Sequence, residues 1–106
     1  MATTKEYMLY VMEQLSDAGD VHCRPMMGEY VLYYRDKVIG NICDNRFLVK
    51  PVPAAVHMMP EAHWETPYEG AKDMLLVDRL EDRSFLKALL EGMYEELPLP
   101  KKKKKA

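Results

Sequence analysis

Cysteine, glycine and tryptophan are scarce in this chain, and their scarcity excludes several classes of protein. Among 106 residues there are two cysteines, five glycines and one tryptophan. The glycines stand singly, so no glycine-rich loop is available to cradle a phosphate. No apolar run approaches the roughly 20 residues that cross a bilayer, and the first residues lack the basic and apolar regions of a secretion signal. We therefore expect a cytoplasmic protein without a membrane span.

Residues that carry chemistry are few and dispersed. Cys23 and Cys43 have no further ligand nearby at zinc-like spacing, and we interpret both as reduced, buried thiols, with a redox pair on neighbouring strands as the alternative. The three histidines form no HxxxH or HExxH pattern. No nucleophile stands beside a base in a known motif. We therefore predict that the protein is not an enzyme and has neither a metal nor a cofactor.

Charge is unevenly distributed along the chain. There are 15 basic and 17 acidic residues, but five of the basic ones are consecutive lysines at residues 101–105. The rest of the chain has ten basic and seventeen acidic residues, a net charge of −7. Because an acidic body repels a phosphate backbone, nucleic-acid binding by the body starts at a disadvantage. We interpret the lysine run as a solubilising tail, with binding to an acidic partner, RNA or an anionic membrane surface as the alternative.

Apolar residues at helical spacing predict three helices. Thr3 and Glu6 suit a capping box before the first helix, and Gly19 is its expected C-terminal stop. Acidic residues precede the last helix, where they suit the positive end of the helix dipole. The predicted helices span residues 4–18, 53–59 and 85–97.

Alternating apolar and aromatic residues predict five strands. In the first strand, Tyr30 and Tyr34 share one face, Tyr33 lies on the other, and Gly28 marks a bulge or a close backbone approach. Turn residues separate the strands. The predicted strands span residues 21–34, 38–43, 47–50, 63–68 and 74–77.

Together these elements predict an α+β protein. The expected architecture is a two-layer α/β sandwich in which an antiparallel five-stranded sheet carries helices, in the order α-β-β-β-α-β-β-α. The domain is predicted to span residues 1–98, followed by a disordered tail rich in proline and lysine at residues 99–106. We expect one face of the sheet to pack on the helices and the other to be partly covered or used for association.

Three stretches of the sequence resemble the TfoX N-terminal domain family. They are RPMMGEYVLYYRDKVIG at residues 24–40, DNRFLVKP at residues 44–51 and TPYEGAKDMLLVDRLEDRSFL at residues 66–86. Within them, the family's recurring positions are occupied by Arg24, Met26, Gly28, Tyr33 and Lys50. Met27, Lys37 and Val49 depart from residues common in the family while keeping an apolar or turn character. The resemblance covers roughly residues 4–97.

The resemblance implies both a fold and a role. The fold is a two-layer α+β domain of the type seen in secretion chaperones, and the role is regulation. The longer TfoX or Sxy proteins activate natural competence together with a cyclic-AMP receptor transcription factor, and we expect this chain to lack the helical C-terminal region of those activators. Function transfers less securely than fold within a family.

We therefore predict a regulatory or adaptor domain that binds an unidentified protein partner in transcription or competence regulation. Arg24 and Lys50 are expected to project from adjacent strands toward one acidic group, with an ion pair to Glu29 or Asp44 as the structural alternative. Paired methionines at residues 26–27 and 58–59 suit an adaptable binding surface, although core filling is the expected use of most methionines. The predicted partner-binding residues are Arg24, Met26, Met27, Gly28, Tyr30, Tyr33, Lys50 and Trp64.

The alternative is a nucleic-acid-binding accessory protein that uses clustered cations against phosphates. Besides Arg24 and Lys50, its contact residues would be Arg35, Lys37, Arg46, Lys101, Lys102 and Lys103. A homodimer through an uncovered strand edge or the sheet face is a further open alternative.

Overall fold

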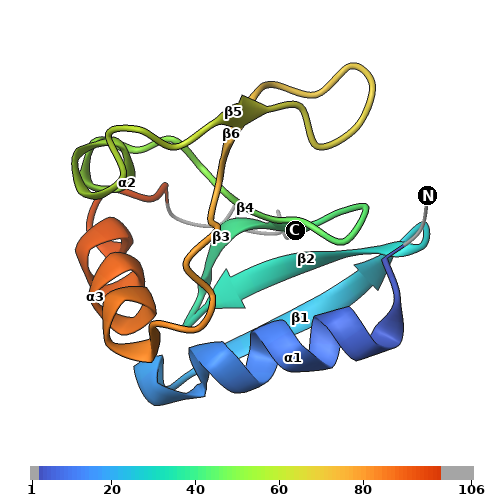
Figure 1. Ribbon diagram of the computed structural model, residues 1–106, viewed down its shortest axis with the longest axis horizontal. Coiled ribbons are helices and arrows are strands. Elements are labelled where there is room, and N and C mark those ends of the chain that lie inside the picture. Colours follow the sequence, from blue (N-terminus) through green and yellow to red (C-terminus); the bar gives the residue numbers. More distant parts are fainter. Residues whose placement is uncertain (1–2, 99–106) are drawn as a thin grey trace, which may run out of the picture.

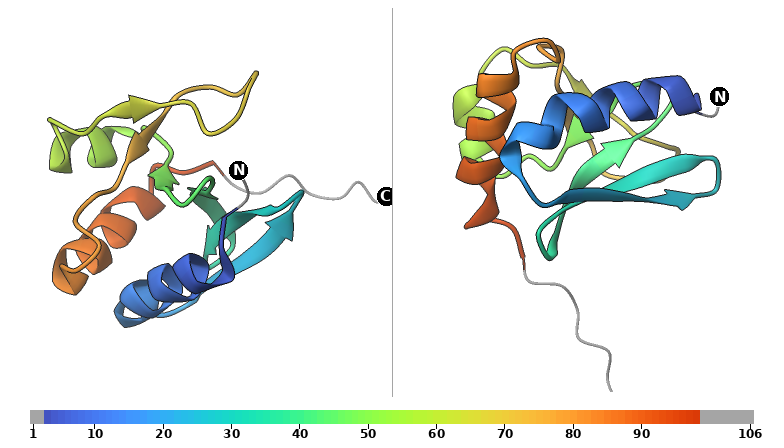
Figure 2. Two further views of the ribbon diagram at one scale, coloured as in Figure 1. Left: turned by 45° about the vertical axis from the view of Figure 1, so that its right-hand side comes forward. Right: turned by 90° about the horizontal axis from the view of Figure 1, so that it is seen from below.

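The computed structural model describes residues 3–98, which form two layers (Figure 1). One layer is a six-stranded antiparallel sheet in the order β1-β2-β3-β4-β6-β5. Helices α1 and α3 lie on the same side of β1 and β2 (Figure 2), and α2 packs against α3. The predicted α+β class is confirmed. The predicted tail at residues 99–106, with Lys101, Lys102 and Lys103, lies outside the described residues.

The three predicted helices and the predicted antiparallel meander are all present. The ends of the helices differ from the prediction by a few residues, which is the usual precision of a boundary inferred from spacing, whereas the meander has four strands rather than three. The elements are α1 (Lys5–Leu15), the short 3-10 helix η1 (Ser16–Ala18), β1 (Val21–Met26), β2 (Glu29–Tyr34), β3 (Lys37–Ile42), β4 (Phe47–Val49), α2 (Pro53–Met58), β5 (Trp64–Glu65), β6 (Met74–Leu76) and α3 (Arg83–Tyr94).

The sheet has six strands rather than the predicted five because residues 21–34 form a hairpin instead of one strand. Met26 pairs with Glu29, and the two residues between them have positive φ, 54° at Met27 and 86° at Gly28. Two successive residues of positive φ make a tight turn whose twist matches that of the flanking strands. Gly28 is therefore a turn residue and not a bulge.

One cross-strand row of side chains lies against the helices. Residues directly opposite one another in antiparallel strands share a face of the sheet. Along this row, the central members are buried in a single core with Val11 and Leu15 of α1 and with Leu86 and Leu90 of α3. The row consists of Cys23, Leu32, Gly40, Val49, Leu75 and Trp64.

Gly40 allows β3 and β4 to approach closely in the middle of that row. A Cβ atom at this position would collide with the carbonyl oxygen of Leu48 and lie 2.8 Å from the Cα of Val49. Both neighbours are backbone atoms of a paired strand, so neither can rotate away. The sheet therefore requires glycine at this position.

The N-terminal cap of α1 differs from the prediction. The hydroxyl of Thr4 accepts a hydrogen bond from the Tyr7 amide at 3.1 Å, so Thr4 and not Thr3 is the cap. The Thr3 hydroxyl donates instead to the Glu29 carboxylate at 2.6 Å. Because this bond joins the start of α1 to β2, the predicted capping box of Thr3 with Glu6 is wrong.

Candidate partner-binding site

A second cross-strand row lies on the face of the sheet that the helices leave open. No helix within residues 3–98 covers β1 and β2 on this side (Figure 2). Arg24 at the edge of the row is exposed, Val31 is half-buried, and Leu48 near the centre is fully buried. The row consists of Arg24, Val31, Asn41, Leu48 and Leu76. We call this side of the sheet the helix-free face.

Three side chains from β1 and β2 form a cluster on the helix-free face. The rings of His22 and Tyr33 are stacked with centroids 5.1 Å apart and an interplanar angle of 4°. The guanidinium carbon of Arg24 lies 5.9 Å from the centroid of the Tyr33 ring, within the range of a cation–π attraction. Of the predicted partner-binding residues, the structure thus brings Arg24 and Tyr33 together.

The tip of the β1–β2 hairpin carries the most exposed apolar side chain of the described residues. Met27 is 97% exposed, and Met26 beside it is also exposed. Gly28 completes the turn. Three of the predicted partner-binding residues therefore stand together at one end of the helix-free face, next to Arg24.

Lys50 lies at a different place on the same side of the sheet. With Asn41, Tyr68 and Met74 it lines a largely apolar groove of about 420 Å³ between the sheet and the loop that follows β5. Because β2 and β3 separate β1 from β4, the prediction that Arg24 and Lys50 project from adjacent strands is wrong. Among residues 3–98, Glu29 pairs with neither cation, since its carboxylate accepts hydrogen bonds from Thr3 and from the Asp44 amide.

Two of the predicted partner-binding residues lie on the helix side of the sheet instead. Tyr30 pairs with Ile42 and packs against the core. Trp64 pairs with Leu75 on the edge strand β5 and is 55% exposed. Since β1 and β5 are the two edges of the sheet, Trp64 does not share a surface with the β1–β2 hairpin tip.

Three cations of the nucleic-acid alternative are engaged within the protein. Lys37 is only 7% exposed, and its ammonium donates to the Tyr94 carbonyl at the end of α3, at 2.9 Å. Arg46 forms an ion pair of 2.6 Å with Glu65 and donates to the carbonyl of Cys43. The guanidinium of Arg35 lies 4.9 Å and 5.1 Å from the ring centroids of Tyr34 and Tyr94. These contacts reduce the cationic surface available to phosphates.

The cysteines are free thiols and not a disulfide. Cys23 is half-buried in β1, Cys43 is buried after β3, and β2 lies between the two strands. Burial raises the pKa of both thiols, and at Cys43 the carboxylate of Glu29 adds to this effect. A raised pKa lowers the thiolate fraction and hence the reactivity. Because β2 separates the two strands, the alternative of a redox pair on neighbouring strands is wrong.

Residues 3–98 contain neither a cluster of metal-ligating side chains nor a membrane-spanning helix. No three side chains of histidine, cysteine, aspartate or glutamate gather there in a way that would hold a metal ion. None of the helices there is both long enough and apolar enough to cross a bilayer.

Neither the hairpin turn at Met27 nor the burial of Lys37 was predicted from the sequence. A signal for the turn was present, because a strand of residues 21–34 would exceed the usual 3–10 residues and contains a glycine at its centre. No comparable signal marks Lys37. Its burial depends on the end of α3, which is far away in the sequence.

The chain is similar in sequence to one protein family and to a curated relative. Residues 13–95 match the TfoX N-terminal domain. The chain is 37% identical over 105 residues to an "uncharacterized 12.7 kDa protein in trpE 5′ region" from Spirochaeta aurantia, an alignment that covers 98% of this chain and 91% of that protein. No solved structure matches the chain.

Proposed function

Because the chain belongs to the TfoX N-terminal domain family, we propose that it is a non-enzymatic regulatory or adaptor domain that binds another protein in transcription or competence regulation. The docking surface is the tip of the β1–β2 hairpin together with Arg24, His22 and Tyr33 on the helix-free face. Family resemblance supports a regulatory role, and the surface supports binding to a protein.

The single observation that carries this proposal is that Met27 has both a strained backbone and an exposed apolar side chain. Its φ of 54° places it in the left-handed region, which costs a residue other than glycine about 1–2 kcal/mol. Its side chain is nevertheless 97% exposed and gains almost no packing against the other described residues. Asparagine or glycine would make the same turn without the strain and without the apolar surface. A strained and exposed apolar residue supports a contact made with another protein.

The chemistry of the surface indicates what kind of partner fits. A methionine side chain is flexible and polarisable, so it suits insertion into an apolar pocket of another protein. Behind it, the arginine and the stacked rings of His22 and Tyr33 supply the aromatic and cationic groups that are enriched in protein interfaces. The partner is therefore expected to present an apolar pocket with an acidic rim.

Affinity capture from a native lysate tests the proposal. The bait is the intact chain, compared with Met27→Asn and Arg24→Glu, with and without nuclease. Leu9→Gln is the matched control, because Leu9 is an apolar side chain 53% exposed on α1, away from the proposed surface. We expect a protein that survives nuclease treatment, is retained by Leu9→Gln, and is lost from Met27→Asn and Arg24→Glu.

Two results would contradict the proposal. Capture that collapses with nuclease would favour the nucleic-acid alternative. A partner that Met27→Asn retains as well as the intact chain does would place the docking surface elsewhere on the molecule.

A further inference from the structure

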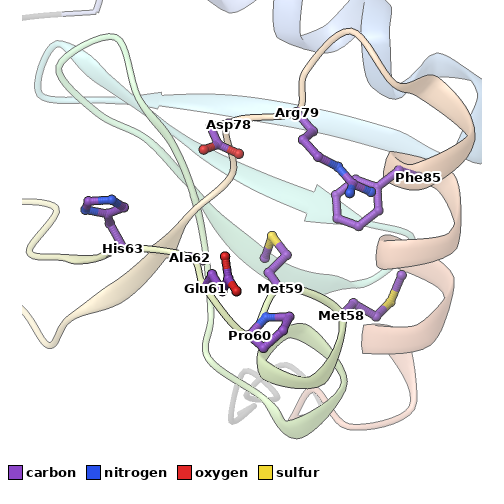
Figure 3. A pocket seen from close by; sticks show the side chains of 9 residues that line it. All are labelled: Met58, Met59, Pro60, Glu61, Ala62, His63, Asp78, Arg79 and Phe85. Atoms are coloured by element: carbon purple, nitrogen blue, oxygen red, sulfur yellow. The ribbon is translucent and has the colours of Figure 1, made fainter.

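A pocket of about 350 Å³ lies between the end of α2, the loop that leads to β5, and the start of α3 (Figure 3). This volume falls within the range of small-molecule sites. None of its lining residues belongs to the proposed docking surface. The pocket is therefore separate from the site that Met27 marks.

The apolar part of the pocket is formed by Met58, Met59 and Phe85. All three side chains are partly buried and pack against the core, so their positions are fixed by the fold. The guanidinium carbon of Arg79 lies 3.8 Å from the centroid of the Phe85 ring. This stack holds a cation beside a flat apolar wall.

Charges of both signs border the same pocket, on different sides. Glu61 and Asp78 lie toward one side, and Arg79 stands with Phe85 on the other (Figure 3). Within residues 3–98, no side chain pairs with either of these two carboxylates. Arg79 has one ion pair there, a long contact of 3.9 Å with Asp82 in which both side chains are about half exposed. Such a contact contributes little and leaves the guanidinium able to bind another anion.

We propose that this pocket binds a small zwitterion, an α-amino acid with an apolar side chain. Its ammonium group lies between Glu61 and Asp78, its carboxylate pairs with Arg79, and its side chain rests on the methionines and Phe85. A ligand with only positive charge would oppose Arg79, and one with only negative charge would oppose the two carboxylates. The fourth ionisable side chain of the rim, His63, is directed away from the centre of the pocket (Figure 3).

A chemical-shift titration of the isotopically labelled full chain tests this proposal. The probes are leucine, methionine and phenylalanine, with glycine as the amino acid that lacks an apolar side chain. Phenylalanine amide removes the carboxylate, and N-acetylphenylalanine removes the ammonium group. We expect saturable shifts at the pocket residues with the three apolar amino acids, and at least about tenfold weaker binding of glycine and of both derivatives.

Variants then assign each charge. The Arg79→Gln variant is expected to bind phenylalanine and phenylalanine amide with equal affinity. The double variant Asp78→Asn, Glu61→Gln is expected to bind phenylalanine and N-acetylphenylalanine with equal affinity. Lys87→Gln, an exposed cation of α3 outside the pocket, is the matched control and should bind as the intact chain does. Absence of saturable shifts up to about 10 mM of the apolar amino acids, or equal binding of phenylalanine and either derivative by the intact chain, would overturn the proposal. Since the derivatives are tested on the unchanged chain, the result does not depend on whether a variant folds.

Discussion

At the scale of single residues, we predict opposite effects on stability when Gly40 and Gly92 are each replaced by alanine. Gly40→Ala places a methyl group against the backbone of β4, so we expect the free energy of unfolding to fall by about 3 kcal/mol. Gly92→Ala in α3 places a methyl group 3.7 Å from the Met58 sulfur and 3.8 Å from the Ala54 Cβ, which are ordinary contacts. Alanine is the better helix former, so this variant should gain about 0.5–1 kcal/mol. Urea unfolding of both variants measures the two changes, and a stable Gly40→Ala protein would contradict the close strand approach.

Met27 provides the second prediction at this scale. Met27→Asn should raise the free energy of unfolding by about 1 kcal/mol, because asparagine tolerates the left-handed conformation of the turn. Met27→Ala is the control that separates strain from exposure. It removes most of the apolar surface but keeps the strain, so its stability should stay close to that of the intact chain. If Met27→Ala stabilises the protein as much as Met27→Asn does, the left-handed strain is not the cause.

Residue patterns predicted part of the candidate site. The placement of Arg24, Met26, Met27 and Gly28 in one region follows from their adjacency in the sequence. A single strand of residues 21–34 would put Arg24 and Tyr30 on the same face, whereas the hairpin pairs Arg24 with Val31 and leaves Tyr30 on the other face. The pocket around Arg79 was not predicted at all, since its residues come from three separated segments.

At the scale of elements, a cluster of contacts fastens the β2–β3 hairpin to the end of α3. The Tyr94 hydroxyl donates to the Asp36 carboxylate at 2.7 Å, and Lys37 donates to the Tyr94 carbonyl. The Tyr94 ring also meets the Tyr34 ring edge to face, with centroids 5.7 Å apart. One residue of α3 therefore joins both strands of the hairpin to the helix.

This cluster predicts how stability depends on pH. The hydrogen bond from Tyr94 lowers the pKa of Asp36, and the same bond raises the pKa of Tyr94. Asp36 therefore contributes stability that is lost as the pH falls through its lowered pKa, and Tyr94 contributes stability that is lost as the pH rises through its raised pKa. We expect the difference in unfolding free energy between the intact chain and Tyr94→Phe to be largest near neutral pH. It should shrink below about pH 4 and above about pH 10.

Asp36→Asn is the control for the acid side of this profile. An asparagine carbonyl still accepts a bond from Tyr94 but does not titrate, so in this background the effect of Tyr94→Phe should no longer shrink in acid. Denaturant unfolding across a pH series measures both profiles. A Tyr94→Phe effect in the intact chain that is the same at every pH would show that the bond contributes nothing through ionisation.

Helices were easier to predict from the sequence than strands, for a physical reason. Helices α1 and α3 each carry their own apolar stripe and their own side-chain cap, and at α3 the Asp82 carboxylate accepts a hydrogen bond from the Phe85 amide. The strand break at Met27 is marked locally only by the neighbouring Gly28, because methionine is not a typical turn residue. The Thr3 cap failed for a tertiary reason, since Glu29 on β2 binds the hydroxyl that a local rule assigns to the helix.

At the scale of the whole molecule, the two sheet edges bear on self-association. Pro25 lies in the edge strand β1 and has no backbone N–H to donate to another strand. The other edge, β5, is only two residues long. Short strands and proline are devices that block pairing between edges. Dimerisation through a strand edge is therefore disfavoured. If the protein forms a homodimer, the helix-free face is the better candidate for the interface.

The distribution of charge over the whole molecule predicts how any nucleic-acid binding would depend on the lysine run at residues 101–105. With Lys37, Arg46 and Arg35 engaged in internal contacts, the acidic body offers phosphates only scattered cations such as Arg24 and Lys50. Any nucleic-acid binding by the full chain should therefore depend on the lysines at residues 101–105. Five phosphate contacts to a duplex would give a slope of log affinity against log salt of about −4.5, and removal of residues 101–106 should abolish binding. Binding to a labelled duplex over a salt series measures this slope.

The opposite result would be a chain without residues 101–106 that still binds the duplex and loses this binding in the Arg24→Glu, Lys50→Glu double variant. It would locate a nucleic-acid surface on the body and contradict the protein-binding proposal.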